Sequence, residues 1–213
     1  MSKETPFITF EGGEGSGKTT QIKLLAEWLR TTGKEVVVTR EPGGTPGGDA
    51  IRKLLVEGEQ NRWDMQTDTL LFMASRRHNL VQVVWPALEK KQWVLSDRFM
   101  DSTYAYQCFG RGLDRAGVRD LYRFVAGDFL PDLTLFLDID VELGLERATK
   151  GQNRALHENR YEGFDLSFHH KLRQGYQTLA AEEPNRMVTV DASGDVDTVQ
   201  QRLRQIITQR FLT

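Results

Sequence analysis

Short runs of consecutive apolar residues recur at five places along the chain. They are rich in β-branched and aromatic side chains and fall at residues 7–10, 36–38, 93–95, 133–137 and 187–190. Runs of this length without polar alternation are typical of strands that are buried on both faces. The segments between them have the apolar spacing of helices. The helix after the first run buries one face, formed by Ile22, Leu25, Ala26 and Leu29. Gly33 then ends that helix.

Strand and helix patterns thus alternate along the whole chain. This alternation predicts an α/β fold with a five-stranded parallel sheet, right-handed crossovers and helices on both faces. A length of 213 residues fits one such domain, so we expect residues 1–213 to form a single domain. Ligands of these sheets bind beyond the carboxyl ends of the strands. Functional side chains are therefore expected at that edge.

Composition narrows the class of protein. The chain is 39% hydrophobic and 27% charged, has a formal net charge of −2, and has no apolar run long enough to span a bilayer. We therefore expect neither nucleic acid nor a membrane as a partner. Residues 1–6 lack the apolar stretch of a secretory signal, and the single cysteine, Cys108, cannot form an internal disulfide. Both observations favour a cytoplasmic location.

The most specific motif lies between the first predicted strand and the helix after it. Its residues are Gly12, Gly13, Glu14, Gly15, Ser16, Gly17, Lys18 and Thr19, which match the full phosphate-binding P-loop pattern. In such a loop, backbone N–H groups and the helix N-terminus bind phosphate oxygens. Lys18 would reach the outer phosphates of a nucleotide, and the Thr19 hydroxyl could hold Mg²⁺. A glycine-rich turn that only caps a helix is the alternative, but such a turn has no need of Lys18 and Thr19.

A carboxylate and a guanidinium follow the third predicted strand, at Asp97 and Arg98. Asp97 could orient Mg²⁺ through its water shell or accept a proton, and Arg98 could bind a phosphate with two parallel hydrogen bonds. A surface ion pair is the alternative interpretation. Their position at the end of an apolar strand, level with the P-loop, favours a functional role.

Residues 70–78 have the pattern of a helix, and its apolar face would carry Leu71, Phe72 and Ser75. Composition alone favours a place in the core for Phe72 over a role as a ligand platform, and it favours solvation of Arg77 and His78.

Residues 101–107 are rich in small donors and acceptors, as a pocket that binds a base edge or a sugar would be. A helix capped by Asp101 is an equal alternative.

Five basic residues and few apolar ones occupy residues 147–160. The basic residues are Arg147, Lys150, Arg154, His157 and Arg160. Such a run usually forms a solvated loop. Phosphoryl transfer, however, needs cations that neutralise the moving charge, and the P-loop supplies only Lys18. We therefore interpret residues 147–162 as a mobile basic lid.

Several motifs, in this order and spacing, resemble those of the thymidylate kinase family of P-loop nucleoside monophosphate kinases. They are FEGGEGSGKTT at 10–20, TREPGGT at 39–45, DRF at 97–99, AYQ at 105–107, GRG at 110–112 and PDLTL at 131–135. The resemblance covers nearly the whole chain. It implies a three-layer P-loop kinase fold with a short lid, phosphorylation of dTMP to dTDP by ATP with Mg²⁺, and a homodimer formed through helices.

The resemblance also implies roles for individual residues at the acceptor site. Phe72 would stack on thymine, and Arg76 would hydrogen-bond to the base edge. Thr103 and Gln107 would complete the base pocket. Tyr106 would lie against the sugar, where a ribose 2′-hydroxyl would clash.

The catalytic residues implied in the same way are Lys18, Asp97, Arg98 and Arg160. Arg98 would bind the acceptor phosphate, while Asp97 would organise the metal and the nucleophile. Glu14 would face the 3′ side of the sugar. In the bacterial type without a basic residue inside the P-loop, catalytic arginines lie in the lid. Arg160, in the Asn-Arg-Tyr-Glu stretch at 159–162, is the first such candidate, and Arg147 and Arg154 are weaker ones.

The chain departs from the family pattern near the base pocket. Cys108 stands where the family generally has Gly, and Ser75, Arg77 and His78 replace a more usual acidic and small-polar pattern. None of these changes removes a group that the chemistry requires. We therefore expect altered affinity and retained activity. Glu41 has no role that the sequence assigns.

Two other functions are compatible with the P-loop. The first is a P-loop kinase for another nucleotide or for a nucleoside, in which Asp97 or Glu11 would accept a proton from a neutral hydroxyl. The second is a nucleotide-sensing switch, which a guanine-reading Asn-Lys-x-Asp motif would support; the sequence has no such motif.

Overall fold

A computed structural model of the protein describes residues 5–59, 61–150 and 165–212. Its centre is one parallel sheet with the strand order β2-β3-β1-β4-β5. The strands are β1 (Phe7–Glu11), β2 (Val36–Arg40), β3 (Trp93–Asp97), β4 (Leu133–Asp138) and β5 (Met187–Asp191). The prediction of an α/β fold with five parallel strands is confirmed.

Each strand extends one or two residues past the end of its predicted run. Arg40 pairs with Asp97 across β2 and β3, and Asp138 pairs with Asp191 across β4 and β5. The apolar pattern ends before the backbone ladder, which continues to the edge of the sheet. The last residue of each strand is therefore polar and lies at the edge where ligands of parallel sheets bind.

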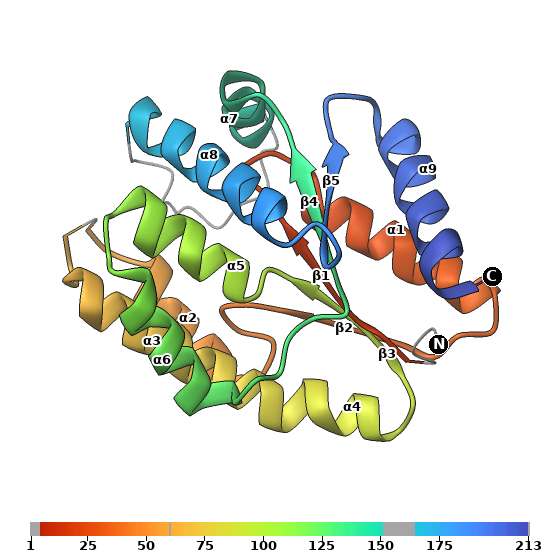
Figure 1. Ribbon diagram of the computed structural model, residues 1–213, viewed down its shortest axis with the longest axis horizontal. Coiled ribbons are helices and arrows are strands. Elements are labelled where there is room, and N and C mark those ends of the chain that lie inside the picture. The colour runs from red at the N-terminus through yellow and green to blue at the C-terminus, as the bar shows by residue number, and fades with distance from the viewer. Residues whose placement is uncertain (1–4, 60, 151–164, 213) are drawn as a thin grey trace.

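Helices cover both faces of the sheet (Figure 1). The α-helices are α1 (Lys18–Thr31), α2 (Pro46–Val56), α3 (Met65–Asn79), α4 (Trp85–Glu89), α5 (Met100–Thr103), α6 (Arg115–Ala126), α7 (Val141–Lys150), α8 (Leu166–Glu182) and α9 (Val196–Ile207). Three π-helical segments continue helices: η1 (Leu80–Val84), η2 (Tyr104–Gly110) and η3 (Thr208–Leu212).

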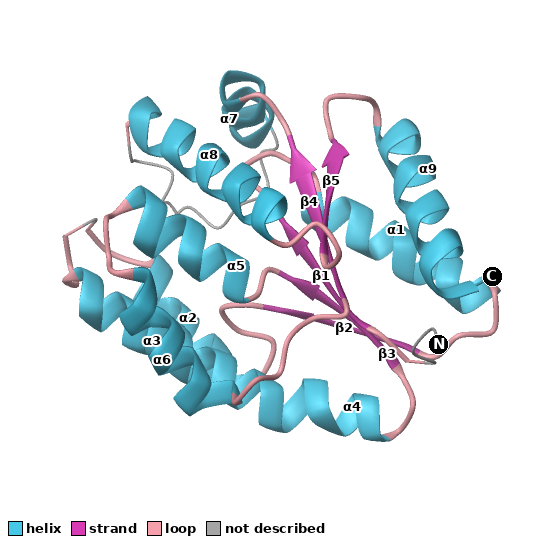
Figure 2. Cartoon of the chain, viewed as in Figure 1, coloured by secondary structure: helices cyan, strands magenta, loops and turns pink. Residues whose placement is uncertain are grey.

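The sheet separates two helical layers, as Figure 2 shows. On one face, α1 and α9 pack against the sheet with buried side chains such as Leu25 and Leu203. The predicted apolar face of α1 is confirmed, because all four of its residues are buried. On the other face, α3, α6 and α8 bury residues such as Met73, Tyr122 and Tyr176. Together with the sheet, the two layers form the expected three-layer arrangement.

The predicted apolar face of α3 is wrong in part. Ser75 is buried as expected, but Leu71 and Phe72 are only half-buried, and Met73 and Arg76 are buried instead. The buried face of α3 also carries Asp68, Thr69 and Asn79. Because this face is strongly polar, the positions of apolar residues do not identify it.

The alternative in which Asp101 caps a helix is also wrong. Helix α5 begins at Met100, one residue earlier, and has no side-chain cap. The Asp101 carboxylate is buried and forms an ion pair with Arg186 at 2.7 Å.

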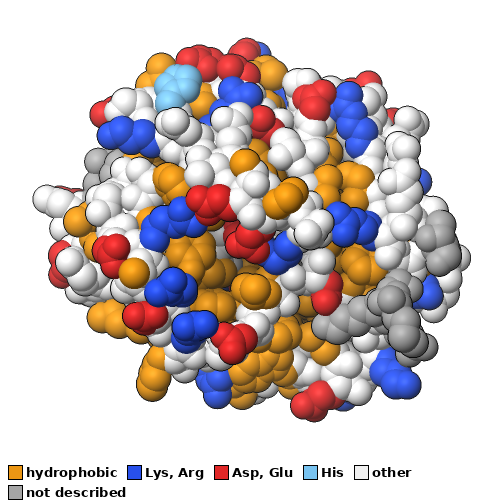
Figure 3. Space-filling view, viewed as in Figure 1, with side chains coloured by type: hydrophobic (Ala, Val, Ile, Leu, Met, Phe, Trp, Pro, Cys, Tyr) orange, Lys and Arg blue, Asp and Glu red, His pale blue; other side chains and the backbone are white. Residues whose placement is uncertain are grey.

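Basic, acidic and hydrophobic side chains are interspersed on the face shown in Figure 3. None of the helices in the described ranges is long and apolar enough to cross a membrane.

Candidate active site

The P-loop connects the end of β1 at Glu11 to the start of α1 at Lys18. Its backbone requires glycine: Gly15 has a φ of +67°, and a Cβ there would lie 1.8 Å from the carbonyl oxygen of Gly144. The loop curls around the Lys18 ammonium, which donates to the carbonyl oxygens of Gly12 at 3.0 Å and Gly13 at 2.8 Å. Burial and the nearby Arg98 cation lower the pKa of Lys18 to about 8. A negatively charged phosphate would stabilise its charged form.

Thr19 and Asp97, the two residues predicted to hold a metal, lie together. The Thr19 hydroxyl donates to Oδ2 of Asp97 at 2.8 Å, and this contact joins the first turn of α1 to the end of β3. Mg²⁺ prefers oxygen ligands and takes only one or two of them from protein, with phosphates and water supplying the rest. This hydroxyl and carboxylate, placed beside the phosphate loop, therefore fit Mg²⁺.

Arg98 lies between the P-loop and a cavity that is described below. Its φ of +71° is unusual for a residue with a side chain and is a form of backbone strain that is common at functional sites. The guanidinium pairs with Glu14 at 3.0 Å and lies 5.0 Å over the ring of Tyr106. The Tyr106 hydroxyl also donates to Glu14 at 3.0 Å. Glu14 thus fixes the positions of both side chains.

A cavity of about 130 Å³ opens beside Arg98, and all seven predicted substrate residues line it. These residues are Glu14, Phe72, Arg76, Arg98, Thr103, Tyr106 and Gln107. The structure therefore brings together side chains from the P-loop, α3, α5 and η2. The individual roles of these residues in binding stay predictions.

Buried polar groups form the deep end of this cavity. Arg76 is only 2% exposed; its Nε donates to Oε2 of Glu41 at 2.7 Å, and its Nη2 donates to the Thr103 hydroxyl at 3.0 Å. Within the described residues, neither Oε1 of Glu41 nor Nε2 of Gln107 has a hydrogen-bond partner, although both atoms are buried. An unpaired buried polar atom costs roughly 1–3 kcal/mol. One acceptor and one donor lining the same cavity are therefore suited to a polar ligand edge.

The sequence did not indicate several residues that line the cavity, namely Glu41, Arg52, Val56 and Phe99. Ser102, which also lines it, lies in the 101–107 stretch that the sequence offered as a pocket. Glu41 follows β2 directly, just as Arg98 follows β3. The same rule about the carboxyl ends of strands would therefore have indicated it. Burial raises the pKa of Glu41, and the adjacent Arg76 opposes that shift. Glu41 and Thr103 together hold Arg76 in place.

The departures from the family pattern lie mostly outside this cavity. Burial raises the pKa of the Cys108 thiol to about 11, so the thiolate is scarce near neutral pH. Arg77 and His78 are exposed, as expected, and contact Val125 and Thr45 respectively. The Ser75 hydroxyl accepts a hydrogen bond from the Gly43 N–H at 3.0 Å and so supports the loop after β2. The expected change in affinity stays a prediction.

The lid prediction is only partly within the described residues. Arg154 and Arg160, with most of the expected lid, lie outside them. Arg147 lies at the end of α7 and donates to the carbonyl oxygens of Ala192 at 2.9 Å and Ser193 at 2.7 Å. It therefore anchors α7 to the loop after β5.

A phosphate loop that faces an acceptor cavity across an arginine is the arrangement of a P-loop kinase for small phosphorylated acceptors. Comparison with known proteins refines this class. A family model described as thymidylate kinase matches residues 10–203, and the chain belongs to the thymidylate kinase family.

Individual relatives agree along nearly the full length. The thymidylate kinase of Afipia carboxidovorans is 48% identical over 205 residues, which cover 96% of this chain and 90% of that protein. That of Caulobacter vibrioides is 45% identical, and the match covers 96% and 97%. The crystal structure of thymidylate kinase from Ehrlichia chaffeensis is 33% identical, has a TM-score of 0.78, and matches over 95% of this chain and 98% of that one. The resemblance found in the motifs is confirmed.

Proposed function

We propose that this protein transfers the γ-phosphoryl group of ATP to dTMP and so forms dTDP. The observation that carries the proposal is one cavity beside the P-loop, which is lined by every residue predicted to bind the acceptor. Its two ends differ in chemistry: Arg76 and Gln107 at one end suit a base edge, and Arg98 at the other suits a phosphate. Membership of the thymidylate kinase family supports the same substrate.

Positioning and charge neutralisation would provide most of the rate acceleration. Lys18 and the loop N–H groups would hold the donor phosphates, while Arg98 would aim the acceptor phosphate in line with the γ-phosphorus. Mg²⁺ at Thr19 and Asp97 would neutralise charge on the donor phosphates. The acceptor phosphate is already ionised near neutral pH, so the transfer needs little help from a base and no covalent enzyme intermediate.

Selectivity for a deoxyribose would come from Tyr106 and Glu14. Tyr106 is 7% exposed and is fixed by its hydrogen bond to Glu14, so its ring cannot readily move away from a 2′-hydroxyl. Glu14 would face the 3′ side of the sugar. Phe72, half-buried at the cavity wall, would stack on the thymine ring.

The lid would supply the remaining positive charge. We propose that Arg160 contacts the transferred phosphoryl group and that residues 147–162 form the lid. Arg147 is a poorer candidate, because its guanidinium already binds the loop after β5.

The release of ADP in the presence of ATP and Mg²⁺ tests the proposed function. The acceptors compared are dTMP, dUMP, UMP, CMP, AMP, GMP and thymidine. A strong preference for dTMP is expected. Turnover with a different acceptor would keep the kinase chemistry and remove the base-pocket assignment. ADP release without any acceptor would point to the nucleotide switch.

We also propose that the protein is a homodimer that assembles through α3 and α6. These helices pack side by side (Figure 1) and expose large apolar side chains, with Phe124 88% exposed and Leu70 55% exposed. An assembly that covers them would remove this apolar surface from water.

A cytoplasmic location stays a prediction from the sequence.

A further inference from the structure

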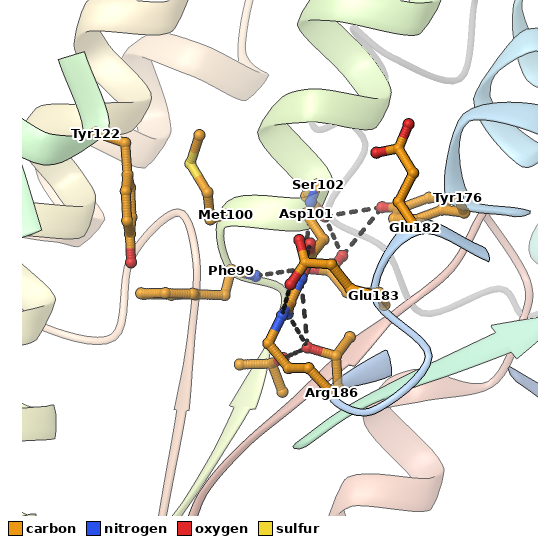
Figure 4. A network of polar contacts seen from close by, with 12 residues as sticks. Phe99, Met100, Asp101, Ser102, Tyr122, Tyr176, Glu182, Glu183 and Arg186 are labelled. Carbon is orange, nitrogen blue, oxygen red and sulfur yellow. Dashed lines mark hydrogen bonds and ion pairs between the residues drawn. The ribbon is translucent and has the colours of Figure 1, made fainter. Parts of the chain in front are cut away.

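Three polar side chains form a hydrogen-bonded cluster beside Arg98, and Figure 4 labels two of them, Ser102 and Tyr176. Glu11 ends β1, Ser102 lies on α5, and Tyr176 lies on α8. Glu11 and Tyr176 are both 0% exposed. The Tyr176 hydroxyl donates to Oε2 of Glu11 at 3.0 Å, and the Ser102 hydroxyl donates to the same oxygen at 2.5 Å. Segments far apart in the sequence thus meet at one carboxylate.

The Glu11 carboxylate sets the direction of both hydroxyl groups. Its other oxygen, Oε1, accepts from the backbone N–H groups of Phe99 at 2.8 Å and Ser102 at 3.2 Å, so the carboxylate cannot turn freely. A hydroxyl has one hydrogen and two lone pairs. The Ser102 and Tyr176 hydroxyls also lie 2.9 Å from each other. When each gives its hydrogen to Glu11, each is left with lone pairs for a different donor.

That donor is the guanidinium of Arg98. Its Nη1 donates to the Ser102 hydroxyl at 3.1 Å and to the Tyr176 hydroxyl at 3.3 Å. Its Nη2 lies on the other side, against Glu14 and the cavity. One nitrogen is thus held by the protein interior while the other faces the acceptor site.

We propose that Tyr176 is a positioning residue for phosphoryl transfer: its hydroxyl, oriented by Glu11, holds Arg98 so that the guanidinium meets the acceptor phosphate. The proposal rests on the proposed function, because it needs Arg98 to bind that phosphate. It assigns a function to α8, a helix from which sequence reasoning selected no residue.

The substitution Tyr176→Phe removes only the hydroxyl. The Tyr176 ring stacks on Phe136 with centroids 5.2 Å apart, and phenylalanine keeps this packing. Tyr122→Phe is a matched control, because Tyr122 is also buried and its hydroxyl also donates a hydrogen bond, to the carbonyl oxygen of Phe129. Thermal unfolding verifies that both variants fold.

The measurement is equilibrium binding of dTMP and of thymidine at pH 8, together with the kinetics of dTMP phosphorylation. Thymidine lacks the phosphate and cannot report on Arg98 as a phosphate ligand. For Tyr176→Phe we expect dTMP binding and kcat/KM for dTMP to fall about 10- to 100-fold, as for a lost hydrogen bond to a charged group. Thymidine binding and the KM for ATP should change less than about twofold, and Tyr122→Phe should leave all four quantities unchanged.

A double-mutant cycle adds a second test. In an Arg98→Ala background, Tyr176→Phe should cause no further loss of dTMP binding, because the residue through which it acts is gone. Three results would each overturn the proposal. They are equal weakening of dTMP and thymidine binding by Tyr176→Phe, unchanged dTMP binding, or full additivity of Tyr176→Phe with Arg98→Ala. Lack of dTMP turnover by the unaltered enzyme would instead overturn the proposed function itself.

Discussion

At the residue scale, Arg98 is the side chain on which the account depends most. It is strained in its backbone, 17% exposed, and held between Glu14 and the hydroxyls of Ser102 and Tyr176. Its position after a strand made it a candidate from sequence. The contacts that fix it come from α5, α8 and the P-loop, and no local pattern in the sequence indicates that these segments meet.

Replacing Arg98 by alanine should separate acceptor binding from donor binding. We expect kcat/KM for dTMP to fall by about three orders of magnitude, since a charged contact that strengthens in the transition state is lost. The affinity for ATP, measured by calorimetry, should change less than about threefold, because Lys18 and the P-loop remain. A parallel fall in ATP affinity would contradict this assignment.

The Glu11 carboxyl makes the stability of the folded protein depend on pH. Burial, with Asp101 adding repulsion, raises the pKa of Glu11 from 4.5 to about 7. The folded state therefore binds this proton more tightly than the unfolded state, and the contribution of Glu11 to stability falls as pH rises from 4.5 to 7.

Glutamine at position 11 cannot ionise and keeps a similar shape. Relative to the unaltered protein, Glu11→Gln should gain roughly 2–3 kcal/mol in the free energy of unfolding between pH 5 and pH 8. Urea titrations at both pH values provide the comparison. If the difference in the free energy of unfolding between the two proteins is the same at pH 5 and pH 8, Glu11 has an ordinary pKa.

At the element scale, the central strands follow from the sequence because their apolar runs are buried on both faces. The buried faces of α3 and α5 do not follow from it, since these faces carry charged side chains. Arg76 and Asp101 are polar by type and yet 2% exposed each. Their charged partners Glu41 and Arg186, which are distant in sequence, compensate for this burial.

The turn before β5 anchors α5 through one buried ion pair. Arg186 contacts Asp101 with two nitrogens at 2.7 and 2.8 Å and also donates to the Thr134 hydroxyl, as Figure 4 shows in part. Arg186→Met would leave the Asp101 carboxylate buried without its cation. The free energy of unfolding should fall by roughly 3–5 kcal/mol.

The exposed pair of Arg115 and Glu182 is the control for this prediction. Its side chains are 43% and 45% exposed, and Arg115→Met should cost less than about 1 kcal/mol. Denaturant unfolding of both variants measures the contrast. Equal losses in the free energy of unfolding would mean that the buried pair of Asp101 and Arg186 stabilises the protein no more than the exposed pair does.

At the scale of the whole molecule, the P-loop motif and the alternation of strands and helices were enough to predict the fold class. The resemblance to the thymidylate kinase family selected seven acceptor residues, and all seven line one cavity. The cavity wall from β2 and α2 was missed, because Glu41, Arg52 and Val56 belong to no motif with an assigned role. Proximity that arises from tertiary packing leaves no periodic signal in the chain.

The proposed homodimer predicts an oligomer that a single charge can disrupt. Phe124→Asp should convert a dimer into a monomer in sedimentation velocity, because it would place a carboxylate in an apolar interface. Val196→Asp, at the distant start of α9 where the side chain is 49% exposed, should leave the dimer intact. A monomeric unaltered protein, or a dimer that persists in Phe124→Asp, would contradict the proposed interface.

A competition among acceptors tests dTMP kinase activity most directly. The enzyme is given ATP, Mg²⁺ and equal amounts of dTMP, UMP, CMP and thymidine, and the products are separated by chromatography. We predict that dTDP forms first and accumulates far ahead of any other product, because the pocket of Arg76, Gln107 and Tyr106 selects thymine on a deoxyribose and Arg98 requires a phosphate. Consumption of another acceptor while dTMP stays intact would contradict the account.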